Sequence, residues 1–76
     1  MTKSLQKLIE VAFDVKVYFS VGSYEMHHYE DGSYCDFHVR QILDLKTLLR
    51  LANGLEVRIY ANGDSVIVRL YEDFRG

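Results

Sequence analysis

Four residues that can ligate a metal or take part in acid–base chemistry lie close together in this chain: His27, His28, Cys35 and His38. Histidine and cysteine are the common ligands of zinc. A cysteine beside a histidine is also the simplest nucleophile–base pair for covalent catalysis. Which of these chemistries is available depends on which side chains share a face, and alternation along a strand decides that.

A predicted hairpin around Asp31-Gly32 divides this cluster between two faces. Asp-Gly is typical of a type I′ two-residue turn. Counting outward from the turn pairs His28 with Cys35 on one face and sends His27 and His38 to the other. Four ligands split in this way cannot complete one tetrahedral zinc site. We therefore expect no metal ion and no cofactor.

The same counting predicts two histidine–carboxylate pairs across the strands: His27 lies opposite Asp36, and Glu25 lies opposite His38. A nearby carboxylate raises the pKa of a histidine, so such pairs are candidates for a pH-sensitive site. Cys35 lies on the apolar face, where a cysteine is usually a small core residue rather than a nucleophile. The sequence contains no P-loop, G-x-S-x-G or H-E-x-x-H motif, and we expect no enzymatic activity.

The periodicity of apolar residues predicts the elements that carry these side chains. Ser4 is a good N-cap for a helix over residues 4–13, with an apolar stripe at helical spacing. From Val15 to Val21 every second residue is apolar, which predicts a strand that a Gly22-Ser23 turn connects to the next one. Asp44 is the N-cap of a second helix, and Asn53-Gly54 ends it in a left-handed conformation.

The clearest predicted element is a C-terminal hairpin around Asn62-Gly63. A two-residue loop there pairs Ile59 with Val66 and places Glu56 opposite Arg69. The predicted order is α-βββ-α-ββ in a single α+β domain over residues 1–76. Two helices would pack on one face of a five-stranded, mainly antiparallel sheet, forming a two-layer sandwich. The sequence does not choose which edge of the first three strands receives the last hairpin.

The other face of this sheet is predicted to be open and rich in tyrosine. It comprises Lys16, Tyr18, Ser20, Glu25, His27, Tyr29, Tyr34, Asp36, His38, Arg40, Arg58, Tyr60, Ile67, Arg69 and Tyr71. Tyrosine and arginine are enriched at protein interfaces. The residues predicted to bind a protein are Tyr18, Tyr29, Tyr34, Arg58, Tyr60, Ile67, Arg69 and Tyr71.

Composition narrows the classes of partner. The chain has 76 residues, 49% of them hydrophobic and 26% charged, with a net charge of −2, as in a folded domain without the positive field of a nucleic-acid or membrane-surface binder. A single cysteine permits no internal disulfide, which favours a reducing, cytoplasmic setting. No apolar run is long enough to cross a bilayer, and the N-terminus lacks the pattern of a signal peptide.

Two families share part of the predicted pattern. The first 54 residues resemble double-stranded-RNA-binding domains in element order, but the lysine cluster that those domains carry at the start of the second helix is replaced by Asp44-Leu45-Lys46-Thr47. The segment from Asp44 to Asp64 resembles the second half of HPr-type phosphocarriers, but it lacks their His-Ala-Arg phosphoacceptor. Neither resemblance transfers a site residue to this chain.

The sequence favours a non-enzymatic protein-interaction module of adaptor or inhibitor type that binds through the tyrosine-rich face. Its partner would be another protein or a second copy, with a homodimer expected because so small a core is marginal. Small domains of this kind are often encoded by phages and mobile elements. The alternative is a nucleic-acid or small-ligand binder that uses the same face.

Overall fold

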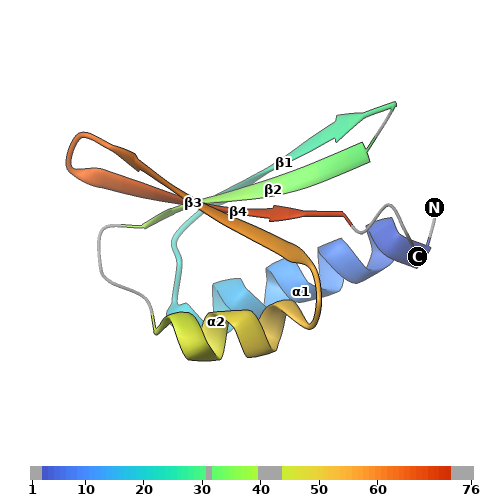
Figure 1. Cartoon of the computed structure of the whole chain (residues 1–76), viewed down its shortest axis with the longest axis horizontal. Coiled ribbons are helices and arrows are strands. Elements are labelled where there is room, and N and C mark those ends of the chain that lie inside the picture. The colour runs from blue at the N-terminus through green and yellow to red at the C-terminus, as the bar shows by residue number, and fades with distance from the viewer. Residues whose placement is uncertain (1–2, 31, 40–43, 73–76) are drawn as a thin grey trace.

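A computed structural model of the chain describes residues 3–30, 32–39 and 44–72. Its elements are α1 (Lys3–Phe19), β1 (Tyr24–Tyr29), β2 (Gly32–Val39), α2 (Leu45–Ala52), β3 (Glu56–Asn62) and β4 (Ser65–Tyr71). The strands form one sheet in the order β1-β2-β4-β3, with every neighbouring pair antiparallel. Both helices lie on the same side of this sheet (Figure 1). The α+β prediction is therefore confirmed, with four strands instead of five.

The predicted first strand is wrong, because the segment after residue 13 continues α1. Val15 is fully buried together with Leu8 and Ala12, and these three residues recur at helical spacing. The segment therefore satisfies a helical period as well as the alternation of a strand. β-Branched residues disfavour a helix only slightly, and burial against the sheet outweighs that preference. Ser4, predicted as the N-cap, lies within the helix.

A left-handed residue, Ser20, ends α1. Its φ is 53°. The Val21 N–H donates to the Lys16 carbonyl at 3.0 Å, and the Ser20 N–H donates to the Val17 carbonyl at 3.4 Å. These two bonds form a Schellman motif, which satisfies carbonyls that the end of a helix leaves without partners. Gly22 and Ser23 lie in the connection to β1 and make no hairpin turn.

Both β-hairpins form where they were predicted, but each pairing is shifted by two residues. In the first hairpin Met26 pairs with Cys35, and Tyr29 pairs with Gly32. In the second hairpin Ile59 pairs with Val68, because Gly63 and Asp64 form the loop in place of Asn62-Gly63. Gly63 has a φ of 62°, which suits its position in the loop. A shift of two residues changes every partner and leaves every side chain on its predicted face.

The second helix begins and ends as predicted. The Asp44 carboxylate accepts hydrogen bonds from the backbone N–H groups of Lys46 at 3.1 Å and Thr47 at 3.3 Å. It also accepts the Thr47 hydroxyl at 2.8 Å. The hydrogen bonds from Thr47 lower the pKa of Asp44. Asn53 closes the helix with a φ of 50°, and its N–H donates to the Leu49 carbonyl.

The core lies between the helices and the two central strands. Phe37 and Cys35 of β2 and Leu70 of β4 are fully buried, as are Leu8 of α1 and Leu48 of α2. The apolar stripes predicted on the helices are only partly buried. Their exposed members are Ile9, Phe13, Leu45 and Leu49. Each helix therefore presents a second, solvent-facing apolar row.

We expect the substitution Ser20→Gly to stabilise the protein. Glycine adopts a positive φ without the steric cost that a Cβ carries, so the free energy of unfolding in urea should rise by about 1 kcal/mol. Ser23→Gly is the matched control, because Ser23 is also exposed but has no positive φ. A loss of stability in Ser20→Gly would contradict the helix end described above.

Candidate interaction surface

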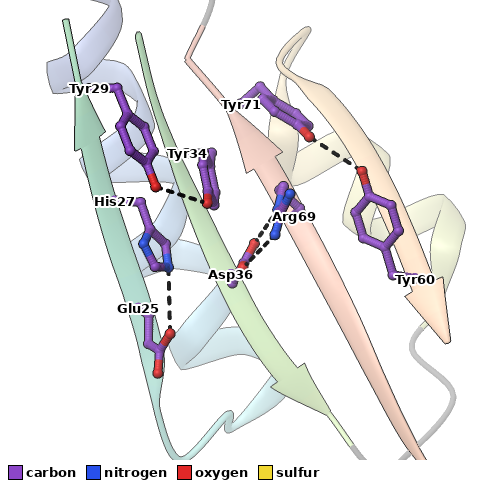
Figure 2. A network of polar contacts seen from close by, with 8 residues as sticks. All are labelled: Glu25, His27, Tyr29, Tyr34, Asp36, Tyr60, Arg69 and Tyr71. Carbon is purple, nitrogen blue, oxygen red and sulfur yellow. Dashed lines mark hydrogen bonds and ion pairs between the residues drawn. The ribbon is translucent and has the colours of Figure 1, made fainter. Parts of the chain in front are cut away.

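One side of the sheet is left uncovered by the helices, and we call it the open face. Alternation along the strands places twelve described side chains there: Glu25, His27 and Tyr29 of β1, Tyr34, Asp36 and His38 of β2, Ile67, Arg69 and Tyr71 of β4, and Glu56, Arg58 and Tyr60 of β3. Figure 2 looks onto this face, with the helices behind the sheet. Every described residue that was predicted for this face from the two hairpins lies on it, whereas the three from the predicted first strand, Lys16, Tyr18 and Ser20, do not.

An ion pair between Asp36 and Arg69 occupies the centre of the open face (Figure 2). Arg69 Nε donates to Asp36 Oδ1 at 2.7 Å, and Nη2 donates to Oδ2 at 3.0 Å. The Arg69 side chain is only 26% exposed, and the Asp36 side chain is 8% exposed. Hydrogen bonding to Asp36 raises the pKa of Arg69. This two-point, charge-assisted contact links the two central strands and fixes the plane of the guanidinium group.

Aromatic rings surround that guanidinium group. Its carbon lies 4.2 Å from the ring centroid of Tyr34 and 5.1 Å from that of Tyr60. The His27 ring stacks on Tyr34 at a centroid distance of 4.7 Å, and Tyr71 lies 5.8 Å from Tyr34. Cation–π and stacking contacts of this kind restrict the rotamers of every ring involved. The side chains at the centre of the open face therefore hold one another in place.

Two pairs of tyrosine hydroxyls border this centre, as Figure 2 shows. The hydroxyl oxygens of Tyr29 and Tyr34 are 3.4 Å apart, as are those of Tyr60 and Tyr71. The hydrogen bond with Tyr29 raises the pKa of Tyr34. The hydrogen bonds with Tyr71 and Arg58 lower the pKa of Tyr60. Tyr29 and Tyr60 remain 57% and 38% exposed, so each offers a ring surface to a partner.

Four of the six tyrosines lie on the open face, one fewer than predicted. Tyr18 belongs to α1, because the segment that carries it is helical. Lys16 and Ser20 are displaced from the face for the same reason. Arg40 falls outside the described residues.

The two predicted histidine–carboxylate pairs are not formed. Glu25 pairs with Asp36, and His27 pairs with Tyr34. His38 pairs with Ile67 of β4. His27 instead contacts a carboxylate of its own strand: His27 Nε2 lies 3.5 Å from Glu25 Oε2. The hypothesis of a pH-sensitive site loses the pairing on which it was based.

Cys35 and His28 do not form a nucleophile–base pair. Cys35 faces Met26, and His28 faces Ser33, whose Oγ is 3.3 Å from His28 Nδ1. Cys35 is fully buried, and desolvation raises the pKa of its thiol to about 12. Within the described residues, no three histidine, cysteine, aspartate or glutamate side chains are grouped to hold a metal ion. No helix in that part of the chain is long and apolar enough to span a bilayer.

The partner of Arg69 is the main feature that the sequence did not reveal. The prediction placed Glu56 opposite Arg69, whereas Glu56 pairs with Tyr71 and its carboxylate lies 3.3 Å from Arg58 Nη2. Arg69 meets Asp36 because β4 lies beside β2. The structure buries Asp36, and a buried carboxylate needs a partner, but the sequence places Asp36 on an open face and does not indicate this burial.

No known protein-family model matches this chain, and neither does any curated protein or solved structure. The proposal for its function is therefore based on the geometry of the open face.

We predict strong energetic coupling between Asp36 and Arg69. Replacing Arg69 with methionine leaves a buried carboxylate without its counterion, which should cost about 3 kcal/mol of unfolding free energy. The double variant Asp36→Leu, Arg69→Met should recover most of that loss, because no charge remains to be desolvated. Urea denaturation of the four proteins in this cycle measures the coupling. Additive effects would contradict the central role of the pair.

We predict that Cys35 is unreactive in the folded protein. A buried thiol whose pKa is about 12 holds almost no thiolate at pH 8. Modification by a thiol reagent should therefore be slow under native conditions and fast in denaturant. Rapid modification at low denaturant would show that β2 is accessible in the native state.

Proposed function

We propose that this protein is a non-enzymatic interaction module whose open face binds another protein. The observation that carries the proposal is the cluster of rings held around the Arg69 guanidinium group. Tyrosine and arginine dominate the energetic centres of protein interfaces. Both helices lie on the other side of the sheet (Figure 1), so among the described residues neither helix covers this cluster.

The organisation of the face favours tight contact. Binding usually costs the freedom of each side chain that it immobilises. Here the Asp36 carboxylate orients Arg69, and the guanidinium group and hydroxyl pairs orient Tyr34 and Tyr60. Much of the ordering that binding requires is therefore complete in the free protein. Rigid rings with polar hydroxyls suit a partner surface that mixes apolar patches with hydrogen-bonding groups.

The charges of the open face favour a protein over a nucleic acid. Among the described residues of this face, three carboxylates (Glu25, Asp36 and Glu56) accompany two guanidinium groups (Arg58 and Arg69), and both guanidinium groups already contact a carboxylate. Nucleic-acid affinity depends on basic groups that are free to neutralise phosphates. The alternative function, a nucleic-acid or small-ligand site, has in its favour the ring stack of His27, Tyr34 and Tyr29, on which a base or planar ligand could stack.

We expect the double substitution Tyr29→Ser, Tyr60→Ser to weaken partner binding strongly. These are the two exposed tyrosines of the face, and neither forms the ion pair between Asp36 and Arg69. Tyr18→Ser is the matched control, because Tyr18 is 58% exposed but lies on α1. A partner captured from the native host and purified should bind the wild type and the control equally. It should bind the double variant about 100-fold more weakly by calorimetry.

Two results would contradict this proposal. One is a purified partner that binds the double variant as tightly as the wild type. The other is binding of single-stranded nucleic acid that falls steeply with salt, which would favour the alternative function.

A further inference from the structure

Among the residues that the structure describes, the edge strand β3 has a strand partner on one side only. β4 lies on one side of it, and the sheet ends on the other. Asn62 and Ser65 flank the two-residue loop, so they form a hydrogen-bonded pair. Alternation then turns the backbone groups of Tyr60 and Arg58 toward β4. The N–H and C=O groups of Val57, Ile59 and Ala61 point away from the sheet.

This edge lacks two of the usual protections against pairing with another strand, and its two charged residues, Glu56 and Arg58, form an ion pair with each other. It contains neither proline nor lysine, and four consecutive residues, 58–61, are exposed. Ile59 is 48% exposed, although its neighbour Val68 on β4 is 2% exposed. The helical layer therefore covers Val57 of β3 but ends short of Ile59, and leaves that apolar side chain at the rim.

The opposite edge, β1, is better covered. Its central residue Met26 is half-buried. Lys16 of α1 extends over this strand, with Nζ 5.7 Å from the ring centroid of Tyr24. A long cationic side chain beside a strand edge hinders the approach of another chain. β3 is therefore the more accessible edge of the sheet.

We propose that two copies of this chain pair through β3, antiparallel, about a two-fold axis at Ile59. The product is a continuous sheet of eight strands, four from each copy. Main-chain hydrogen bonds supply the attraction, as in other cases of strand addition to a free edge. The proposal is independent of the function assigned to the open face, because it uses the edge of the sheet and not its surface.

The sequence of β3 favours this pairing over two neighbouring ones, centred on Arg58 and on Val57. Centred on Ile59, the pairing places Arg58 opposite Tyr60 of the partner copy, a favourable cation–π contact, and opposes no like charges. Centred on Arg58, it would oppose two guanidinium groups. Centred on Val57, it would need the N–H of Leu55, which already donates to the Ala52 carbonyl at 3.1 Å.

The pairing also completes the apolar side of the sheet. Ile59 of each copy meets the same residue of the other at the two-fold axis, and the exposed part of both side chains leaves water. Burial of apolar surface adds to the main-chain bonds. The open faces of the two copies then lie on the same side of one longer sheet.

Amide hydrogen exchange by NMR at several protein concentrations tests the pairing residue by residue. The amides of Val57, Ile59 and Ala61 should exchange fast in dilute protein and slowly in concentrated protein. Those of Arg58 and Tyr60 should be protected at every concentration, because they bond to β4. Exchange at Val57, Ile59 and Ala61 that does not depend on concentration would overturn the proposal.

Sedimentation equilibrium of edge variants provides the second test. Ile59→Lys opposes two ammonium groups at the axis and should weaken the dimer by at least about 100-fold. Ala61→Pro removes an N–H group that points away from β4. It should also weaken the dimer, and it should leave the backbone hydrogen bonds between β3 and β4 in place. Circular dichroism confirms that each variant is folded. Met26→Lys on β1 is the matched control and should remain dimeric.

Three outcomes would overturn the proposal. They are a wild type that is monomeric at millimolar concentration, a dimer that survives Ile59→Lys, and a dimer that dissociates in Met26→Lys instead. The Tyr29→Ser, Tyr60→Ser variant should still dimerise. It loses the cation–π contact between Arg58 and Tyr60 of the other copy, which is only a small part of the attraction between the two strands. Loss of the dimer in that variant together with its retention in Ile59→Lys would locate self-association on the open face.

Discussion

The antiparallel pairing of β2 with β4 is the contact on which the rest of this structure depends. It joins two hairpins that are separated along the chain by α2, and it makes them one sheet. On its covered side Cys35 and Phe37 meet Leu70 and Val68 in the core. On its open side the same pairing brings Arg69 to Asp36. One alignment of two strands therefore builds both the hydrophobic core and the polar centre of the open face.

The faces of the strands could be predicted from the sequence, although the pairings could not. Both turn signals were located to within one residue, and each error shifted the partners by two positions. Because side chains alternate with a period of two, an even shift returns every residue to its own face. Tyr29 and Tyr34 therefore reach the open face, and their hydroxyls meet, even though Tyr29 pairs with Gly32.

Two features could not be predicted from the sequence, for physical reasons. The segment from Val15 to Phe19 is compatible with both a strand and a helix, and only burial against a sheet that is distant in the chain decides between them. The contact between Asp36 and Arg69 depends on which edge of the first hairpin receives the second. No local signal encodes that choice, because a helical crossover can reach either edge.

The order of strands in the sheet also has a consequence for how the chain folds. β1 with β2, and β3 with β4, are neighbours along the chain, so each hairpin closes only a short loop. The pairing of β2 with β4 brings together Asp36 and Arg69, which are 33 positions apart along the chain. Closing this longer loop costs more conformational entropy. The hairpins and helices can form early, and joining of the two hairpins becomes the slow, cooperative step. Substitutions in this central pairing should thus slow folding, whereas those at the outer strands should mainly accelerate unfolding.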